Sequence, residues 1–275
     1  MSTKVVLVFS LAFALLAAFA RAQTSGVEPS KVQPVILGIT REAVKPGKTA
    51  SVVHDRAEAM KSMHLPSGLP ITIALSSITG REEILYLHFY DSMGMIEDAE
   101  KTVAAEPGEQ AKVDRLEEQE GDMLLEKRDL TLIRMPELTY HPEVDWAQTQ
   151  YLDLITIHVR PGHHLEYLEL RKMALAGHVR GGVETNLVVF KTTSGSPSPL
   201  YFILRPIKTL HTHDALRAKG FGEPLTDEEN AQMIKLLGAA VESEEEEFYR
   251  VEPSISHVTP EWAVSNVAFW RGSRP

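Results

Sequence analysis

The sequence lacks cysteine altogether among its 275 residues. This absence excludes disulfides, thiolate nucleophiles and thiolate metal sites, so the fold must be stabilised by ordinary hydrophobic cores. The chain is also short of positive charge, with 28 Lys and Arg against 38 Asp and Glu and a formal net charge of −10. Because that balance repels polyanions and the basic residues are interspersed, no nucleic-acid partner is expected.

Long apolar runs are lacking too, with one exception at the N-terminus. Lys4 precedes an apolar run at 5–20, and Ala20-Arg21-Ala22 supplies small residues for cleavage. This pattern predicts a signal peptide at 1–22; the alternative, a retained anchor, would need about 20 apolar residues to cross a bilayer. We expect a secreted or periplasmic protein, without a membrane anchor after cleavage, that begins with a flexible segment at 23–33.

Several signatures of catalysis are missing as well. No G-x-S-x-G, G-x-G-x-x-G, P-loop or H-E-x-x-H pattern occurs, which argues against a serine hydrolase, a nucleotide cofactor and a zinc peptidase. His211 and His213 could chelate a metal from an extended strand, but no third ligand accompanies them at motif spacing. A lone axial histidine for haem, His88 or His158, stays open. The prediction is therefore no metal and no cofactor.

An internal repeat organises the rest of the chain. Lys45-Pro46-Gly47-Lys48 returns as Arg160-Pro161-Gly162-His163, an offset of 115 residues. The same offset carries the apolar runs at 71–75 and 84–89 onto similar runs at 186–190 and 200–204. One offset that aligns three separate elements indicates duplication of a structural unit.

Each half has the same predicted order of elements. The expected strands are 35–41, 71–77, 84–90 and 130–135, then 151–159, 186–192, 200–205 and 263–270. The expected helices are 48–63, 91–104, 109–126 and 162–176, and a long helix that opens with a capping box at Thr226; the acidic run 244–247 is interpreted as a solvated helix face.

This order predicts an α+β fold of two tandem ferredoxin-like β-α-β-β-α-β repeats, at 34–141 and 142–275. A four-stranded sheet with helices on one face leaves its other face open, and two such faces can bury each other. We therefore expect an intramolecular pseudo-dimeric α/β barrel, with its boundary near Pro142.

Two stretches of the chain resemble a known family. The stretch Ile39-Thr40-Arg41-Glu42-Ala43-Val44-Lys45-Pro46-Gly47-Lys48 and the segment 116–125 look like the dimeric α/β-barrel superfamily, especially NIPSNAP-like proteins and exported bacterial tandem members. The resemblance covers nearly the whole chain after residue 22, but its motifs report fold. It implies relatives that include cofactor-independent monooxygenases, haem-binding or haem-degrading proteins and small-molecule binders.

Strand alternation selects the candidate site. In the strand at 84–90, Leu85, Leu87 and Phe89 form a face suited to packing under helices, while Tyr86, His88 and Tyr90 share the other face. That row could bind an aromatic ligand or form a hydrogen-bonded core between the sheets. With the equivalent and neighbouring positions, the candidate ligand-binding residues are Arg41, Tyr86, His88, Tyr90, His158, Tyr201, Arg205, Asn266 and Trp270.

Three functions follow from these residues. The first is an exported protein that binds a small apolar or aromatic molecule. The second is a cofactor-independent monooxygenase-like or isomerase-like enzyme, in which His88 or His158 moves a proton and Arg41 or Arg205 steadies an enolate-like anion. The third is an interaction scaffold with filled cores, and an oligomer is compatible with all three.

Overall fold

A computed structural model describes residues 29–196, 199–219 and 225–271. The strands are β1 (Ile36–Val44), β2 (Thr72–Ser77), β3 (Glu83–Tyr90), β4 (Leu124–Arg134), β5 (Tyr151–Val159), β6 (Val188–Ser194), β7 (Leu200–Ile207) and β8 (Val241–Val251). The helices are α1 (Thr49–Ser62), α2 (Met93–Ala104), α3 (Pro107–Glu120), α4 (His164–Gly181), α5 (Leu210–Lys219), α6 (Asp227–Ala240) and α7 (Val267–Trp270).

The eight strands close into one antiparallel barrel in the order β1-β3-β2-β8-β5-β7-β6-β4. Two seams join the first four strands to the last four: β2 pairs with β8, and β4 pairs with β6. Gly195 directly follows β6, at the end of the β4–β6 seam, and has a φ of +86°. A side chain is excluded here, because a Cβ would overlap the carbonyl oxygen of Asp129. The predicted α+β class and the closed barrel are confirmed.

The barrel interior is a packed apolar core to which all eight strands contribute. Its strand residues are Leu37, Ile39, Ile73, Leu75, Leu85, Leu87, Phe89, Leu130, Leu132, Leu152, Leu154, Val188, Phe190, Leu200, Phe202, Leu204, Tyr249 and Val251. Trp146, Trp262 and Trp270 close one end, with Trp146 edge-on to Phe89 at 5.1 Å between ring centroids. The interface between the two sheets is therefore packed from the tryptophan end inward, as the scaffold hypothesis expected, and a cavity remains at the opposite end, beside Leu130, Leu200 and Phe202.

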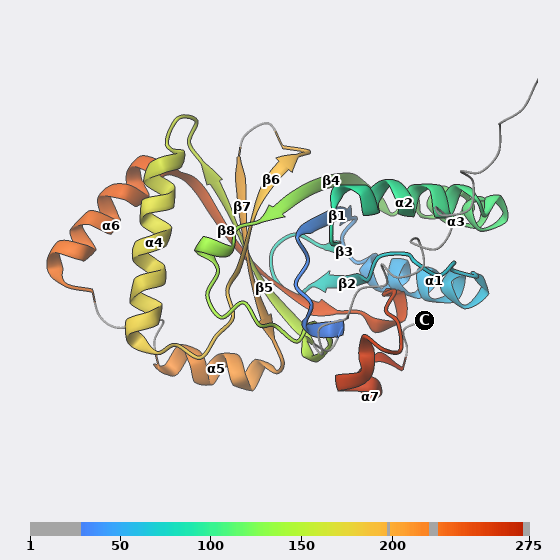
Figure 1. Cartoon of the computed structure of the whole chain (residues 1–275). Coiled ribbons are helices and arrows are strands. Elements are labelled where there is room, and N and C mark those ends of the chain that lie inside the picture. The colour runs from blue at the N-terminus through green and yellow to red at the C-terminus, as the bar shows by residue number, and fades with distance from the viewer. Residues whose placement is uncertain (1–28, 197–198, 220–224, 272–275) are drawn as a thin grey trace, which may run out of the picture.

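The helices form two layers on opposite sides of the barrel. Figure 1 shows α1, α2 and α3 on one side and α4, α5 and α6 on the other. Beneath α4 and α6 lies a second apolar core that includes Ile155, Tyr167, Ile203 and Leu236. None of the helices in the described ranges has both the length and the hydropathy needed to cross a bilayer.

The C-terminal region differs most from the sequence prediction. The strand expected at 263–270 is wrong, because this stretch forms a 3₁₀ turn, Ala263–Asn266, and the short helix α7. The last strand is instead β8, which contains the acidic run expected on a helix. Pairing with β5 along its length and with β2 near its end satisfies the backbone of β8 and overrides the weak strand propensity of glutamate.

Three other expectations are corrected. The helix expected at 109–126 ends at Glu120, and β4 begins at Leu124. The face assignment in β3 is reversed. Leu85, Leu87 and Phe89 point into the barrel, and Tyr86, His88 and Tyr90 point toward the helices. In the segment expected to be flexible, the part from residue 29 on contains a 3₁₀ turn, Pro29–Lys31, and the Gln33 side chain bonds to Val144 and Trp146. The predicted signal peptide, 1–22, lies outside the described residues.

Candidate functional site

A cavity of about 670 Å³ lies between the outer face of β2 and β3 and the helices α1 and α2. A second cavity of about 310 Å³, bordered by α1 and α3, shares Met60, Leu65, Tyr86, His88 and Ile255 with the first. We call the two together the helix-side cavity. Most of its exposed wall is apolar, and the row Tyr86, His88 and Tyr90 lies on its sheet side.

The row forms an aromatic floor. The Tyr86 and His88 rings are stacked with 6.2 Å between centroids and 13° between planes, and the Tyr90 ring follows at 6.4 Å and 34°. Alternate residues of one strand share a face, so the three rings lie along the same side of β3. The floor therefore presents three ring systems to whatever occupies the cavity.

The protonation state of His88 follows from its two threonine neighbours. Thr40 donates its hydroxyl proton to Asp129 Oδ1 at 2.6 Å, so it can only accept from His88 Nε2, which lies 3.3 Å away. Nε2 therefore carries the hydrogen, and Nδ1 accepts from the Thr72 hydroxyl at 3.0 Å. Burial lowers the pKa of His88 to about 4, which keeps the ring neutral at pH 7.

A buried ion network borders the smaller part of the cavity. Arg56 of α1 donates from Nε and Nη2 to Glu120, and from Nη1 to Glu42 and to the Tyr86 hydroxyl. Side-chain exposure is 10% for Arg56, 6% for Glu42 and 0% for Glu120. These residues fix one end of the aromatic floor. The sequence prediction missed them, although Arg56 stands four residues from both Val52 and Met60 on the buried stripe of α1.

The equivalent region of the second half is filled. Tyr201 is fully buried, with its ring 4.3 Å from that of Tyr167 and its hydroxyl 2.6 Å from His164 Nδ1. Burial raises the pKa of Tyr201 to about 12. Arg205 points to the same helix side and forms an ion pair with fully buried Asp153. Side chains of the second half thus occupy the space that is open beneath α1 and α2.

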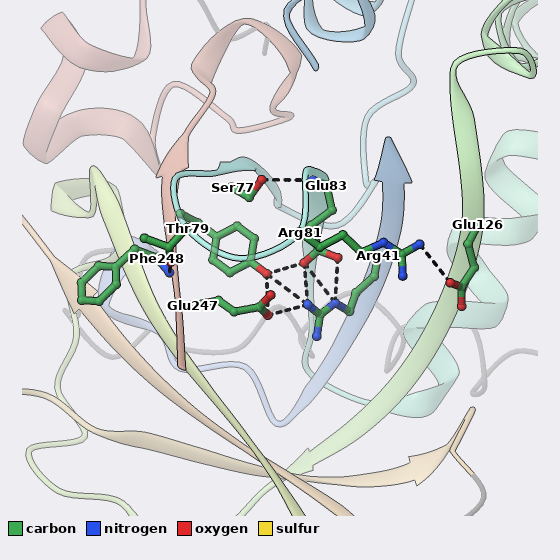
Figure 2. Close-up of polar contacts among 9 residues, drawn as sticks. Arg41, Ser77, Thr79, Arg81, Glu83, Glu126, Glu247 and Phe248 are labelled. Atoms are coloured by element: carbon green, nitrogen blue, oxygen red, sulfur yellow. Dashed lines mark hydrogen bonds and ion pairs between the residues drawn. The ribbon is translucent and has the colours of Figure 1, made fainter. Parts of the chain in front are cut away.

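Arg41 and His158 lie in another place, at the open end of the barrel. They line a cavity of about 380 Å³, which we call the mouth cavity. Figure 2 shows Arg41 held between Glu83 and Glu247. Arg41 faces the barrel interior whereas His88 faces the helices, so the structure does not bring these two together. Arg205 is likewise separated from His88, in the other helical layer.

The two remaining candidates lie at the closed end of the barrel. Trp270 is 3% exposed, and its Nε1 donates to the carbonyl oxygen of Ala147 at 2.7 Å. Asn266 ends the neighbouring 3₁₀ turn. Trp270 therefore packs as a plug over the barrel core and does not line the helix-side cavity.

The histidines offer little to a metal or to haem. His211 and His213 lie on α5, where residues two apart point in different directions, so they do not have the extended conformation that a chelating pair would need. Across the described ranges, no cluster of three or more His, Asp or Glu could hold a metal ion. Both ring nitrogens of His88 are engaged by threonine hydroxyls, so this residue offers no axial ligand for haem.

No protein-family model matches the chain, and no curated protein sequence matches it. Solved structures resemble it in fold. A monooxygenase candidate from Fusobacterium nucleatum has a TM-score of 0.51 at 12% identity and covers 80% of this chain and 93% of that one. An anthrone oxidase-like protein has a TM-score of 0.52 at 15% identity and covers 79% and 92%. By fold, this chain is similar to the dimeric α/β-barrel proteins.

Proposed function

We propose that the protein binds a small, largely apolar, ring-containing molecule in the helix-side cavity. The observation that carries this proposal is the aromatic floor of Tyr86, His88 and Tyr90 beneath apolar helix side chains. Sites for small molecules commonly measure about 300–1,000 Å³ and combine apolar walls with a few polar groups. The cavity of about 670 Å³ falls within that range.

The chemistry of the floor favours a neutral ligand. His88 is neutral at pH 7. The two carboxylates next to Tyr86, Glu42 and Glu120, are paired with Arg56, and Lys127 lies 3.8 Å from Glu42 as a second cation. Flat rings stack on aromatic side chains, and such contacts contribute about 0.5–1.5 kcal/mol beyond the burial of area. A flat apolar molecule would thus gain from both the walls and the floor.

The test is a titration with the neutral fluorescent probe N-phenyl-1-naphthylamine. The wild-type protein should enhance its fluorescence saturably. Ala99→Trp on α2 should abolish the enhancement, because Ala99 lines the cavity and a Trp would fill it. Ala111→Trp on α3 is the matched control, because Ala111 is exposed and lies outside the lining.

Two results would overturn the binding proposal. One is a wild-type protein that gives no saturable signal. The other is an Ala99→Trp variant that stays folded by circular dichroism and binds the probe like the Ala111→Trp control. Either result would favour the scaffold function, which the packed core of the barrel also supports.

The second candidate is a cofactor-independent oxygenase or isomerase acting at the same cavity. Its proton acceptor would be Nδ1 of the neutral His88 ring, which would first have to give up its hydrogen bond from the Thr72 hydroxyl. The names of the two structural neighbours suggest a probe reaction in which anthrone and O₂ give anthraquinone and water. Oxygen uptake that requires His88, tested with His88→Gln, would support this candidate, and absence of uptake above the uncatalysed rate would reject this reaction.

Three further points are part of the proposal. Within each half the strand order is 4-1-3-2, with β8, β5, β7 and β6 as the second set, which supports two tandem ferredoxin-like repeats. The likeness to NIPSNAP-like exported proteins is proposed on the sequence stretches given above. Export with cleavage after Ala22 predicts a secreted or periplasmic protein whose N-terminal residue is Gln23, which mass spectrometry of the protein from its host would reveal.

A further inference from the structure

The mouth cavity is chemically distinct from the helix-side cavity. It lies at the end of the barrel opposite the tryptophan plug, because β1 runs from Leu37 beside Phe89 to Ala43 beside Glu83. Its volume is about 380 Å³, and charged side chains share its wall with apolar ones. The proposed function does not use this cavity.

Negative charge is in excess on its inner wall. Arg41 donates from Nη2 to Glu83 and to Glu247, each at 2.6 Å, and these carboxylates are only 4% and 11% exposed. One guanidinium thus faces two carboxylates. Tyr249 also contacts both, but its hydroxyl has one proton to give. The inner wall therefore carries one uncompensated negative charge.

A second polar pair continues this wall. Thr156 of β5 and Glu245 of β8 are register partners, and both line the mouth cavity. Thr156 is 2% exposed, and its Oγ1 is buried without a hydrogen-bond partner. A buried hydroxyl that lacks a partner costs about 1–3 kcal/mol, so a ligand that bonded to it would recover part of that cost. Glu245 is exposed and has no ion pair among the described residues.

The apolar part of the wall includes Leu130, Leu200 and Phe202, and Phe202 is the register partner of Thr156 on β7. At the rim Arg81 pairs with Glu126 at 3.0 Å, whereas Arg128 donates to the neutral carbonyl oxygen of Gly195 and keeps its positive charge. Counting every charged lining residue, four glutamates face three arginines. The cavity therefore joins an acidic wall with an unpartnered hydroxyl to an apolar wall of similar extent.

We propose that the mouth cavity binds a small organic ammonium ion with an apolar body. The ammonium group would donate to Glu245 and Glu247 and to the Thr156 hydroxyl, while the hydrocarbon part packs on Leu200 and Phe202. A bare metal ion fits less well, since no group of three or more metal-ligating side chains exists among the described residues. A carboxylate ligand would meet the acidic wall at close range.

The test uses 2-phenylethylamine, which is an ammonium ion at pH 7, with 3-phenylpropanoate as the anionic counterpart and 2-phenylethanol as the neutral one. Calorimetric or NMR titration of the full chain should show saturable binding of the ammonium ion alone. Glu245→Gln should weaken it about tenfold through loss of a charge-assisted hydrogen bond, and Thr156→Val should weaken it as well. Glu244→Gln should stay within twofold of wild type, because Glu244 points out of the barrel.

The alternatives give different results. Failure of the ammonium ion to bind at millimolar concentration would overturn the proposal, as would equal binding of 3-phenylpropanoate. Equal weakening by Glu244→Gln and Glu245→Gln would also overturn it, because it would report only general attraction to an acidic surface. Ala99→Trp, which fills the helix-side cavity, should leave this binding unchanged and so separates the two sites.

Discussion

The ion network beneath α1 gives a quantitative prediction. Arg56→Met retains much of the side-chain volume but leaves fully buried Glu120 without a cation, and leaves Glu42 with Lys127 alone at 3.8 Å. Removal of one partner from a buried ion pair costs about 3–5 kcal/mol, because the remaining charge has lost both water and its counterion. We therefore expect the free energy of unfolding at pH 7 to fall by about that amount.

The loss should depend on pH in a defined direction. Burial raises the pKa of Glu120 even with Arg56 present, and removal of the guanidinium should raise it further. A carboxyl whose pKa is higher in the folded state than in the unfolded state favours folding at low pH. That contribution is lost as the pH rises through the folded-state pKa. The deficit of Arg56→Met should thus be smaller at pH 5 than at pH 7.

Urea unfolding followed by far-UV circular dichroism would measure both effects. Lys61→Met is the matched control on the same helix, because the Lys61–Glu58 pair is exposed and its loss should leave stability unchanged. Adding Glu120→Gln to Arg56→Met should restore part of the loss, since it removes one uncompensated charge. A loss below about 1 kcal/mol at pH 7, or one equally large at pH 5, would refute the reasoning.

Three other predictions concern single side chains. Burial lowers the pKa of His88 from 6.5 to about 4, so the free energy of unfolding should fall by about 3 kcal/mol as the pH falls through that interval. In His88→Phe the free energy of unfolding should change less over the same pH interval than in wild type. Trp270→Ala should lower the free energy of unfolding by about 3–5 kcal/mol because it leaves a cavity at the closed end of the barrel, and Trp270→Phe should lower it less. Equal losses for the two variants in thermal unfolding would contradict the packing role of Trp270. Thr226→Ala should cost about 1 kcal/mol through loss of the capping box of α6, and Ser243→Ala, outside any cap, should cost less.

Local patterns predicted most of the elements because each had a signal of its own. β5 begins and ends at the predicted residues, 151 and 159, and the capping box at Thr226 marks the start of α6. Strand β8 had no such signal. Its sequence, VESEEEEFYRV, has no alternation of polarity over the glutamates. Its partners are distant in the chain, from 82 residues for Val159 and Val241 to 176 residues for Leu75 and Val251.

The candidate site was predicted in part. Alternation in β3 separated Tyr86, His88 and Tyr90 from their apolar neighbours, but a period of two does not tell which face meets the helices. Closure of the barrel decides this, because the interior accepts the apolar set. The threonines that fix the His88 tautomer come from β1 and β2, and only the register of three strands brings them within hydrogen-bond distance.

The two seams of the barrel have a consequence for how the protein responds to dilution. If β2–β8 and β4–β6 joined separate chains, each tenfold dilution would weaken the assembly by about 1.4 kcal/mol. Here one chain supplies both edges of each seam, so closure is a first-order event and concentration does not enter its equilibrium. The unfolding midpoint of the barrel should accordingly be the same at nanomolar and micromolar protein.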